Sequence, residues 1–141
     1  WIAKACNKVQ GQITSGTNAI AQRAAIAALK APKSKIQYMI DEFKKRRDLV
    51  LALLSEVEGL KVNVPEGAFY VFPDVSFFFG KTLRGRTIGN ASDFSLYLLE
   101  EAMVATVTGE AFGDANCIRI SYAASEKELR EAIRRIKESL A

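Results

Sequence analysis

Residues 18–31 consist almost entirely of alanine, isoleucine and leucine, and this segment constrains the fold more than any other in the 141-residue chain. A turn cluster at residues 14–18 precedes it and Pro32 follows it, so the pattern predicts a helix. A helix that is apolar all round is buried on every side. A domain of this size seldom supplies that much cover, so we expect a partner surface from a further part of the protein or from another subunit.

The composition is that of one globular domain, with 49% hydrophobic residues, 26% charged residues and a net charge of +4. It excludes disordered and fibrous classes. No apolar run reaches the roughly 18–20 residues that a membrane span needs, and no signal-peptide pattern opens the chain. The charge permits nucleic-acid binding without arguing for it. Residues 1–6 read as a helix already under way without an initiator methionine, so we expect the chain to be a piece of a longer protein.

Histidine is absent and only two cysteines occur, Cys6 and Cys117, far apart in the sequence. This excludes a zinc site and a Ser-His-Asp or Cys-His apparatus, so we expect no metal. Free thiols of a cytosolic protein are the default interpretation of such a pair.

The hydrophobic periodicity predicts helices separated by short strands. Helices are expected at residues 2–13, 18–31, 33–58, from 92 and from 125, and strands at 60–64, 68–72, 103–107 and 117–122, with 73–91 irregular. Only a tight turn separates the first two strands, so they can pair antiparallel. The predicted fold class is α/β, or α+β in two layers, with a small mixed or antiparallel sheet of three to four strands flanked by helices.

Arg119 is the most informative single residue, because it lies in the alternating strand 117–122. Alternation places Ile118 and Ile120 on one face and Arg119 on the other. A guanidinium on such a strand is costly to desolvate unless an anion meets it, and its planar fork suits bidentate capture of a carboxylate. The alternative is an internal salt bridge to a nearby Asp or Glu.

The loop at residues 109–113 places Gly109 and Gly113 on either side of Phe112. One interpretation is a plain turn with Phe112 in the core. The other is a loop whose glycines let backbone and ring approach a ligand. The loop by itself does not decide between them.

Three other motifs have plainer explanations. Gly80-Lys81-Thr82 lacks the earlier glycine of a phosphate loop, because Val75 stands there. The run of basic residues 44–47 fans around a helix, and no aromatic platform interleaves with it. Lys35 has nothing nearby to desolvate its amine, so it is a poor candidate for a Schiff base.

Together these segments resemble the C-terminal part of a class I (fold type I) pyridoxal-phosphate aminotransferase, most nearly the bacterial aspartate aminotransferases of type Ib. The residues that carry the resemblance are 13–22, 46–48, 65–71, 92–107, 109–113 and 118–123. The resemblance implies that residues 1–31 are helices from the end of the large cofactor domain and the interdomain region. Residues 32–141 would be the C-terminal small domain.

The same resemblance implies roles for single residues. Arg119 would grip the α-carboxylate of the substrate, and Phe112 with Gly109 would line the substrate side of the pocket. Ser15 and Asn18 would lie in the segment that borders the neighbouring subunit's active site in a homodimer. The family usually has a proline where this chain has Thr108, a difference that would loosen the loop.

In the family, the Schiff-base lysine, the aspartate for the pyridine nitrogen and the phosphate donors precede the matched region. We therefore expect no catalytic residue here, no activity of the chain alone and no bound pyridoxal 5'-phosphate. The intact enzyme would be a cytoplasmic homodimer that moves an amine between amino acids and 2-oxo acids, with aspartate and 2-oxoglutarate as substrates and with neither nucleic acid nor membrane as a partner. The alternatives are a fold type I aminotransferase of aromatic or broad specificity, a synthase with the same cofactor, and a stand-alone basic α/β binding module.

Overall fold

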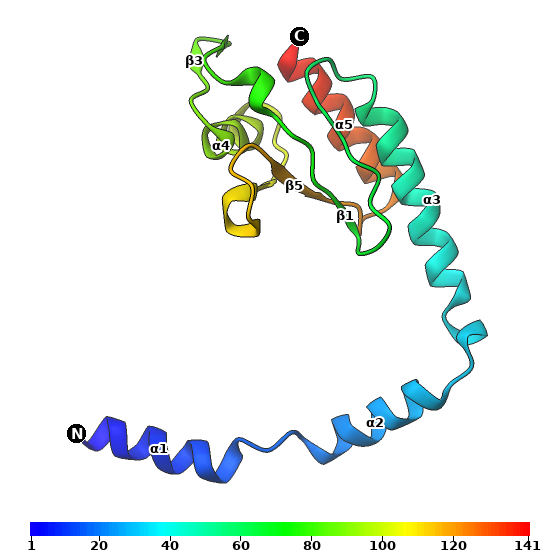
Figure 1. Ribbon diagram of the computed structural model, residues 1–141, viewed down its shortest axis with the longest axis vertical. Helices are drawn as coiled ribbons and strands as arrows, with labels where there is room; N and C mark the ends of the chain where they lie inside the picture. The colour runs from blue at the N-terminus through cyan, green and yellow to red at the C-terminus, as the bar shows by residue number, and fades with distance from the viewer. The chain divides into compact units, whose positions relative to one another are not determined.

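The computed structural model describes residues 1–141, which form two compact units. Unit 1 comprises Trp1–Tyr38 and unit 2 comprises Met39–Ala141. Figure 1 shows helices alone in the blue N-terminal part of the chain and helices with strands in the green-to-red part. The domain boundary after residue 31 stays a prediction about the intact protein.

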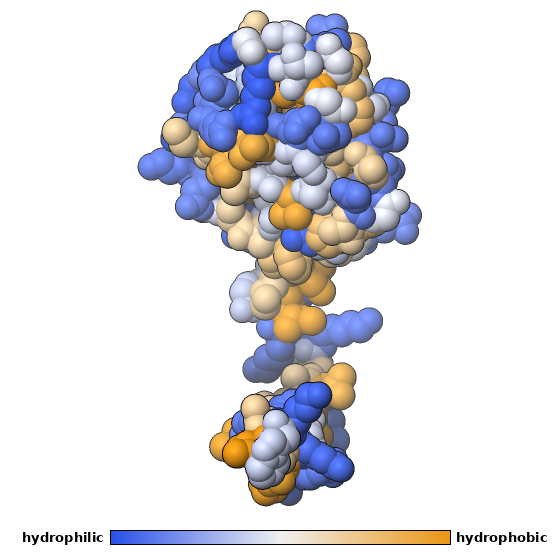
Figure 2. Space-filling view, turned by 90° about the vertical axis from the view of Figure 1, so that its left-hand side faces the viewer, coloured by the Kyte–Doolittle hydropathy of each residue, from blue (hydrophilic) through white to orange (hydrophobic).

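Unit 1 contains two helices, α1 (Ile2–Thr14) and α2 (Ala19–Lys30), followed by the 3-10 turn η1 (Lys33–Lys35). Both helices were predicted, and Asn18 caps α2 as the turn cluster indicated. Neither helix buries a residue, although both carry large apolar side chains. Figure 2 shows this apolar surface in orange beside polar groups. Nothing within unit 1 covers the segment whose composition requires burial.

Unit 2 contains three helices: α3 (Gln37–Leu54, which begins at the last residues of unit 1), α4 (Ala91–Glu101) and α5 (Glu126–Leu140). The predicted helix 33–58 is shorter at both ends. At its start η1 is a separate turn. At its end the Ser55 hydroxyl donates to the Ala52 carbonyl, and the next amides bond three residues back. This tightening of the last turn ends the α-helix before Gly59. No helix of the chain is long and apolar enough to cross a lipid bilayer.

The central sheet has three antiparallel strands in the order β1 (Tyr70–Val71), β5 (Ile118–Ser121) and β4 (Val107–Thr108). The prediction of a small antiparallel sheet is therefore confirmed. The predicted strand 60–64 is wrong as a strand, because only an isolated bridge joins Lys61 to Asp74. Residues 103–107 are extended only at their end, since Met103 has a positive φ of 53°.

A hairpin lies in the segment that was predicted to be irregular. It pairs β2 (Thr82–Leu83) with β3 (Arg86–Thr87). Its two turn residues, Arg84 and Gly85, both have positive φ, at 45° and 83°. Two such residues match the twist of a two-residue hairpin. Arginine is uncommon in that conformation, so the sequence signal was weak.

The core lies between one face of the sheet and the three helices, which form the second layer (Figure 1). Ile118 on β5 packs into the same cluster as Leu54 of α3, Phe94 of α4 and Ile133 of α5. The predicted capping box of α5 is formed at Ser125 and Glu128. Because the helices cover one face, the opposite face of the sheet is left to carry the polar residues.

Candidate functional site

The open face of the sheet carries Arg119. Ile118 and Ile120 are 1% and 9% exposed, whereas Arg119 between them is half-buried on the opposite face. The predicted alternation along the strand is thus confirmed. Val71 of β1 pairs with Ile120 of β5, so the residue after Val71, Phe72, lies beside Arg119. On the other side of β5, Val107 of β4 pairs with Arg119.

A cavity of about 360 Å³ opens at Arg119. It is lined by Asn63, Pro65, Gly67, Tyr70, Phe72, Phe112 and Arg119. All of these residues belong to unit 2. Arg47 of α3 supports the rim, because its Nη1 donates to the Pro65 carbonyl at 3.2 Å.

Arg119 makes no ion pair and no hydrogen bond, so the internal salt bridge that the sequence left open is not formed. Its contacts are aromatic: Cζ lies 4.2 Å from the centroid of the Phe112 ring and 5.2 Å from that of Tyr70. Such contacts attract a cation and leave its N–H donors free. An unpaired guanidinium in a cavity with apolar walls can bind an anion from outside the chain.

Gly109 holds the loop that carries Phe112. It opens η3 (Gly109–Phe112), its amide donates to the Cys117 carbonyl at 2.7 Å, and its own carbonyl accepts from the Asp114 amide at 3.2 Å. A Cβ at residue 109 would be closer to the backbone oxygens of Asp114 and Cys117 than atoms normally approach. Glycine is therefore required for this close approach.

Phe112 is 47% exposed and packs edge-on against Phe72 at 6.5 Å. It does not enter the core, so of the two interpretations of this loop the structure favours the one in which the ring faces a ligand. Thr108, which replaces the usual proline, has φ −58° and ψ 141°, angles that proline also adopts. Its hydroxyl accepts from Ser92 at 3.2 Å. The backbone there follows the course that a proline would impose, and the expected loosening of the loop stays a prediction.

A second row of polar side chains lies beside the cavity, in an adjoining groove that shares Asn63 and Phe72 with it. Burial raises the pKa of the Cys117 thiol to about 11, and the hydrogen bond and negative charge of Asp114 act in the same direction. Hydrogen bonds from Ser76 lower the pKa of Asp74. The thiol is protonated at neutral pH and is therefore a poor nucleophile.

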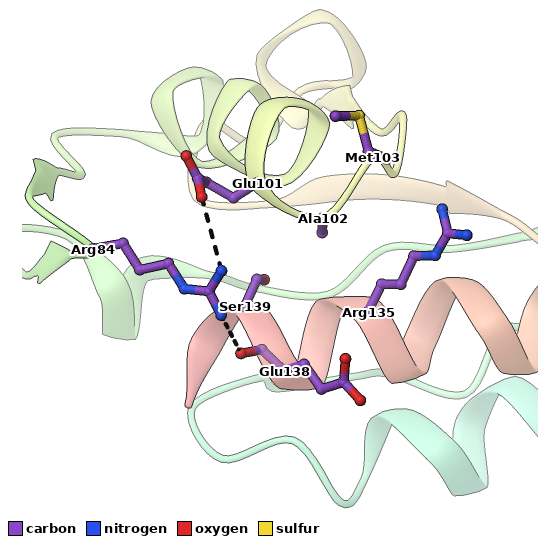
Figure 3. Close-up of a pocket in the computed structure, with 7 residues that line it drawn as sticks. All are labelled: Arg84, Glu101, Ala102, Met103, Arg135, Glu138 and Ser139. Carbon is purple, nitrogen blue, oxygen red and sulfur yellow. Dashed lines mark hydrogen bonds and ion pairs between the residues drawn. The ribbon is translucent and has the colours of Figure 1, made fainter.

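A different cavity, of about 250 Å³, lies between the C-terminal ends of α4 and α5 (Figure 3). Arg84 donates to the Glu138 carbonyl at 2.8 Å and lies 3.8 Å from the Glu101 carboxylate. Arg135 pairs with Glu131. Every cation at this cavity already has an anionic or carbonyl partner. We therefore interpret the contacts of Arg84 as structural links between the β2–β3 hairpin, α4 and α5. The Arg119 cavity is the candidate site.

The other predicted site residues lie in unit 1. Ser15 ends α1, and the Asn18 side-chain oxygen accepts from the amides of Ile20 and Ala21 at 2.8 and 3.2 Å. Both residues are exposed. Their predicted position beside a neighbouring subunit's active site stays a prediction.

Sequence reasoning missed Tyr70, Phe72 and Asn63 as residues of the cavity. A signal for the two aromatic residues existed, since they alternate along their strand as Arg119 does along its own. To place Tyr70 and Phe72 beside Arg119 from this alternation, one must know the register between two strands about fifty residues apart, and no local pattern supplies that register.

The cavity contains one cation and no lysine. An amine that can form a Schiff base and donors for a phosphate are the groups that hold pyridoxal 5'-phosphate. The residues present do not fit that cofactor, and they do fit a carboxylate.

Comparison with known proteins identifies the class. The sequence profile described as "Aminotransferase class I and II" matches residues 1–136. The bifunctional aspartate aminotransferase and glutamate/aspartate-prephenate aminotransferase of Petunia hybrida is 46% identical over 140 residues, which is 96% of this chain and 29% of that protein. The crystal structure of the aspartate aminotransferase from Rhizobium meliloti superposes with a TM-score of 0.85 at 44% identity, over 97% of this chain and 34% of that one. An alanine aminotransferase from Pyrococcus furiosus gives 0.79 at 29% identity, over 99% and 34%.

The chain therefore belongs to the class I and II aminotransferases. Proteins of this family use pyridoxal phosphate. The chain spans about a third of the length of the relatives it matches.

Proposed function

We propose that this chain provides the carboxylate-binding part of an aminotransferase, with Arg119 as the residue that holds the α-carboxylate of the substrate. The observation that carries the proposal is the unpaired guanidinium at the cavity. Amino acids and 2-oxo acids both have a carboxylate next to the reacting carbon. One arginine can therefore orient the amine donor and the amine acceptor alike.

The walls of the cavity strengthen this interaction. Phe112 and Tyr70 present apolar rings around the guanidinium, and the rim is formed by Pro65 and Gly67. A bidentate ion pair is stronger where water is displaced than in bulk solvent. Fixing the carboxylate at two points also fixes the position of the neighbouring carbon, which contributes to the geometry that the reaction requires.

Aspartate and 2-oxoglutarate are the substrates that we propose, because the relatives named above include aspartate aminotransferases. Alanine or prephenate as a substrate is the second candidate, supported by the names of the Pyrococcus and Petunia relatives. Arg119 is the one cation at the cavity, so a second carboxylate must be met by residues elsewhere in the intact protein. Rates with aspartate and alanine as donors, and with 2-oxoglutarate and prephenate as acceptors, would separate these candidates.

The exposed surface of unit 1 supports the proposal that the intact enzyme is a homodimer in which Ser15 and Asn18 border the partner's active site. Ile20 and Leu29 of α2 are 81% and 88% exposed, and such side chains are normally covered. We further propose that the residues that bind pyridoxal 5'-phosphate lie outside the 141 residues and that the enzyme is cytoplasmic. A stand-alone binding module is disfavoured by the match over 136 residues to aminotransferases.

The test is substitution of Arg119 in the full-length enzyme that contains this chain. Arg119→Leu should raise KM for both substrates about 100-fold or more and lower kcat, because a charge-assisted bidentate contact is lost. Arg119→Lys should recover part of the loss, since the charge stays and the fork does not. Arg84→Leu is the matched control: it removes a paired arginine at the other cavity and should lower stability without changing KM. Kinetics near those of the wild type for Arg119→Leu would contradict the proposal.

The chain alone offers a second test. We expect purified residues 1–141, incubated with pyridoxal 5'-phosphate and then dialysed, to retain no aldimine absorbance band and to catalyse no transfer from aspartate, because the cavity has no lysine. Turnover by this piece would contradict the assignment of its role.

A further inference from the structure

The orientation of Arg119 lacks the usual support. Arginines in partly buried positions are commonly held by a carboxylate or a carbonyl, and Arg46 and Arg47 of this chain are held in that way. Arg119 has neither. A free arginine side chain samples many rotamers, and a ligand would have to remove part of that conformational entropy on binding. Something other than an acid must limit that freedom if the cavity is to be preformed.

Two aromatic rings from separate elements lie against the guanidinium. Tyr70 belongs to β1 and pairs with Ser121, two residues along β5 from Arg119 and on the same face. Its ring centroid is 5.2 Å from the Arg119 Cζ, and that of Phe112 is 4.2 Å away. Tyr70 is itself held by an edge contact with Phe69 at 5.5 Å. Phe112 in turn packs edge-on against Phe72 at 6.5 Å, so each ring has a packing contact besides the one with Arg119.

Aromatic contacts differ from an ion pair because they leave the charge and the N–H donors of the guanidinium available to a ligand. A carboxylate would hold the guanidinium but would neutralise it and occupy its donors. A ring attracts the cation through its quadrupole and uses none of the five N–H groups. Arg119 can thus be restrained while its charge and its fork remain free for a ligand.

We infer that Tyr70 is a positioning residue: together with Phe112, its ring holds the Arg119 guanidinium in the orientation that receives the α-carboxylate. This inference rests on the proposed function. The role belongs to the ring, since the Tyr70 hydroxyl makes no hydrogen bond within the chain.

The experiment compares two substitutions of Tyr70 in the full-length enzyme. Tyr70→Leu keeps apolar bulk and removes the quadrupole, so KM for aspartate and for 2-oxoglutarate should rise roughly tenfold, with a much smaller change in kcat. Tyr70→Phe keeps the ring and should restore KM to within about twofold of the wild type, as expected when the cation–π contact is kept. Phe77→Leu is the matched control, because it removes a ring that lies over Lys81 away from the cavity and should leave KM unchanged.

A further readout separates positioning from a general structural effect. A primary amine without a carboxylate does not use Arg119, so its slow reaction should proceed equally in the wild type and in Tyr70→Leu. An equal loss for the amine and for aspartate would overturn the inference, and so would a Tyr70→Phe enzyme as impaired as Tyr70→Leu. If Arg119→Leu has no effect on KM, the proposed function fails. If only Arg119→Leu has an effect, the proposed function stands and the role of Tyr70 is refuted.

Discussion

The two units of this chain use apolar residues in opposite ways. Unit 2 encloses Leu54, Phe94 and Tyr97 at 0% exposure, whereas unit 1 leaves Ile20 and Leu29 almost fully exposed. Unit 1 also has no acidic residue, and its charged side chains are Lys4, Lys8, Arg23, Lys30, Lys33 and Lys35. The difference shows that an apolar pattern predicts that a surface will be covered, but does not show which part of a protein covers it.

The largest expected difference between the units comes from truncating one leucine in each. Leu54→Ala opens a cavity in a closed core and should lower the free energy of unfolding by about 2–5 kcal/mol. Leu29→Ala, at 88% exposure, should change it by less than about 0.5 kcal/mol in the isolated chain. Urea titrations followed by circular dichroism would measure both. Equal losses would show that α2 is packed in solution and would break the contrast.

Two glycines provide the next comparison. Gly109→Ala would press a methyl group onto two backbone oxygens and should cost about 1–3 kcal/mol or more while displacing Phe112. Gly11 lies inside α1, where an added methyl group would meet no other atom within 4 Å, so Gly11→Ala should raise helicity, worth about 0.5–1 kcal/mol for that helix. Thermal unfolding and the helical circular dichroism signal test the pair. A Gly109→Ala chain of unchanged stability would contradict the close approach.

The helix caps should differ by a smaller amount. Ser125→Ala breaks the capping box of α5, whose apolar face is buried, and should lower the stability of unit 2 by about 1 kcal/mol. Asn18→Ala removes two capping hydrogen bonds from α2 but should only fray that helix, because α2 buries nothing. Hydrogen exchange resolved by residue would locate each effect. Loss of protection throughout unit 2 in Asn18→Ala would show that the two units are coupled, against this expectation.

The last comparison concerns the two thiols and stability at alkaline pH. The folded pKa of Cys117 is raised from 9.0 to about 11, so the unfolded chain loses this proton first as the pH rises. Stability should fall between about pH 9 and pH 11. Cys117→Ala should make this fall shallower, over a background from Tyr97 and Tyr122, whose pKa values are also raised by burial. Cys6→Ala, which removes the exposed thiol of unit 1, is the matched control for the loss of a thiol outside the core.

Local signals predicted most of the helical structure. The capping box at Ser125, the cap at Asn18 and the spacing of apolar residues lie within a few residues of the elements that they specify. The end of α3 and the hairpin at Arg84 were missed because hydrogen bonds of Ser55 and an uncommon positive φ decide them. Propensity gives little warning of either.

The candidate site was only partly predictable. Arg119, Phe112 and Gly109 were singled out from alternation and from family resemblance. The structure places Arg119 and Phe112 in one cavity, whereas Gly109 does not line it and instead holds the loop that carries Phe112. Tyr70 was not found, because its contact with Arg119 depends on the pairing of two distant strands.

The amino-acid order alone determined where the helices form, which side of the last strand is apolar and that the helix at residues 18–31 needs a cover, because these properties depend on neighbours along the chain. Only the tertiary structure decided that the Arg119 guanidinium meets aromatic rings and no carboxylate. The physical reason is that strand register is set by the packing of the whole sheet against its helices, and register determines which side chains become neighbours.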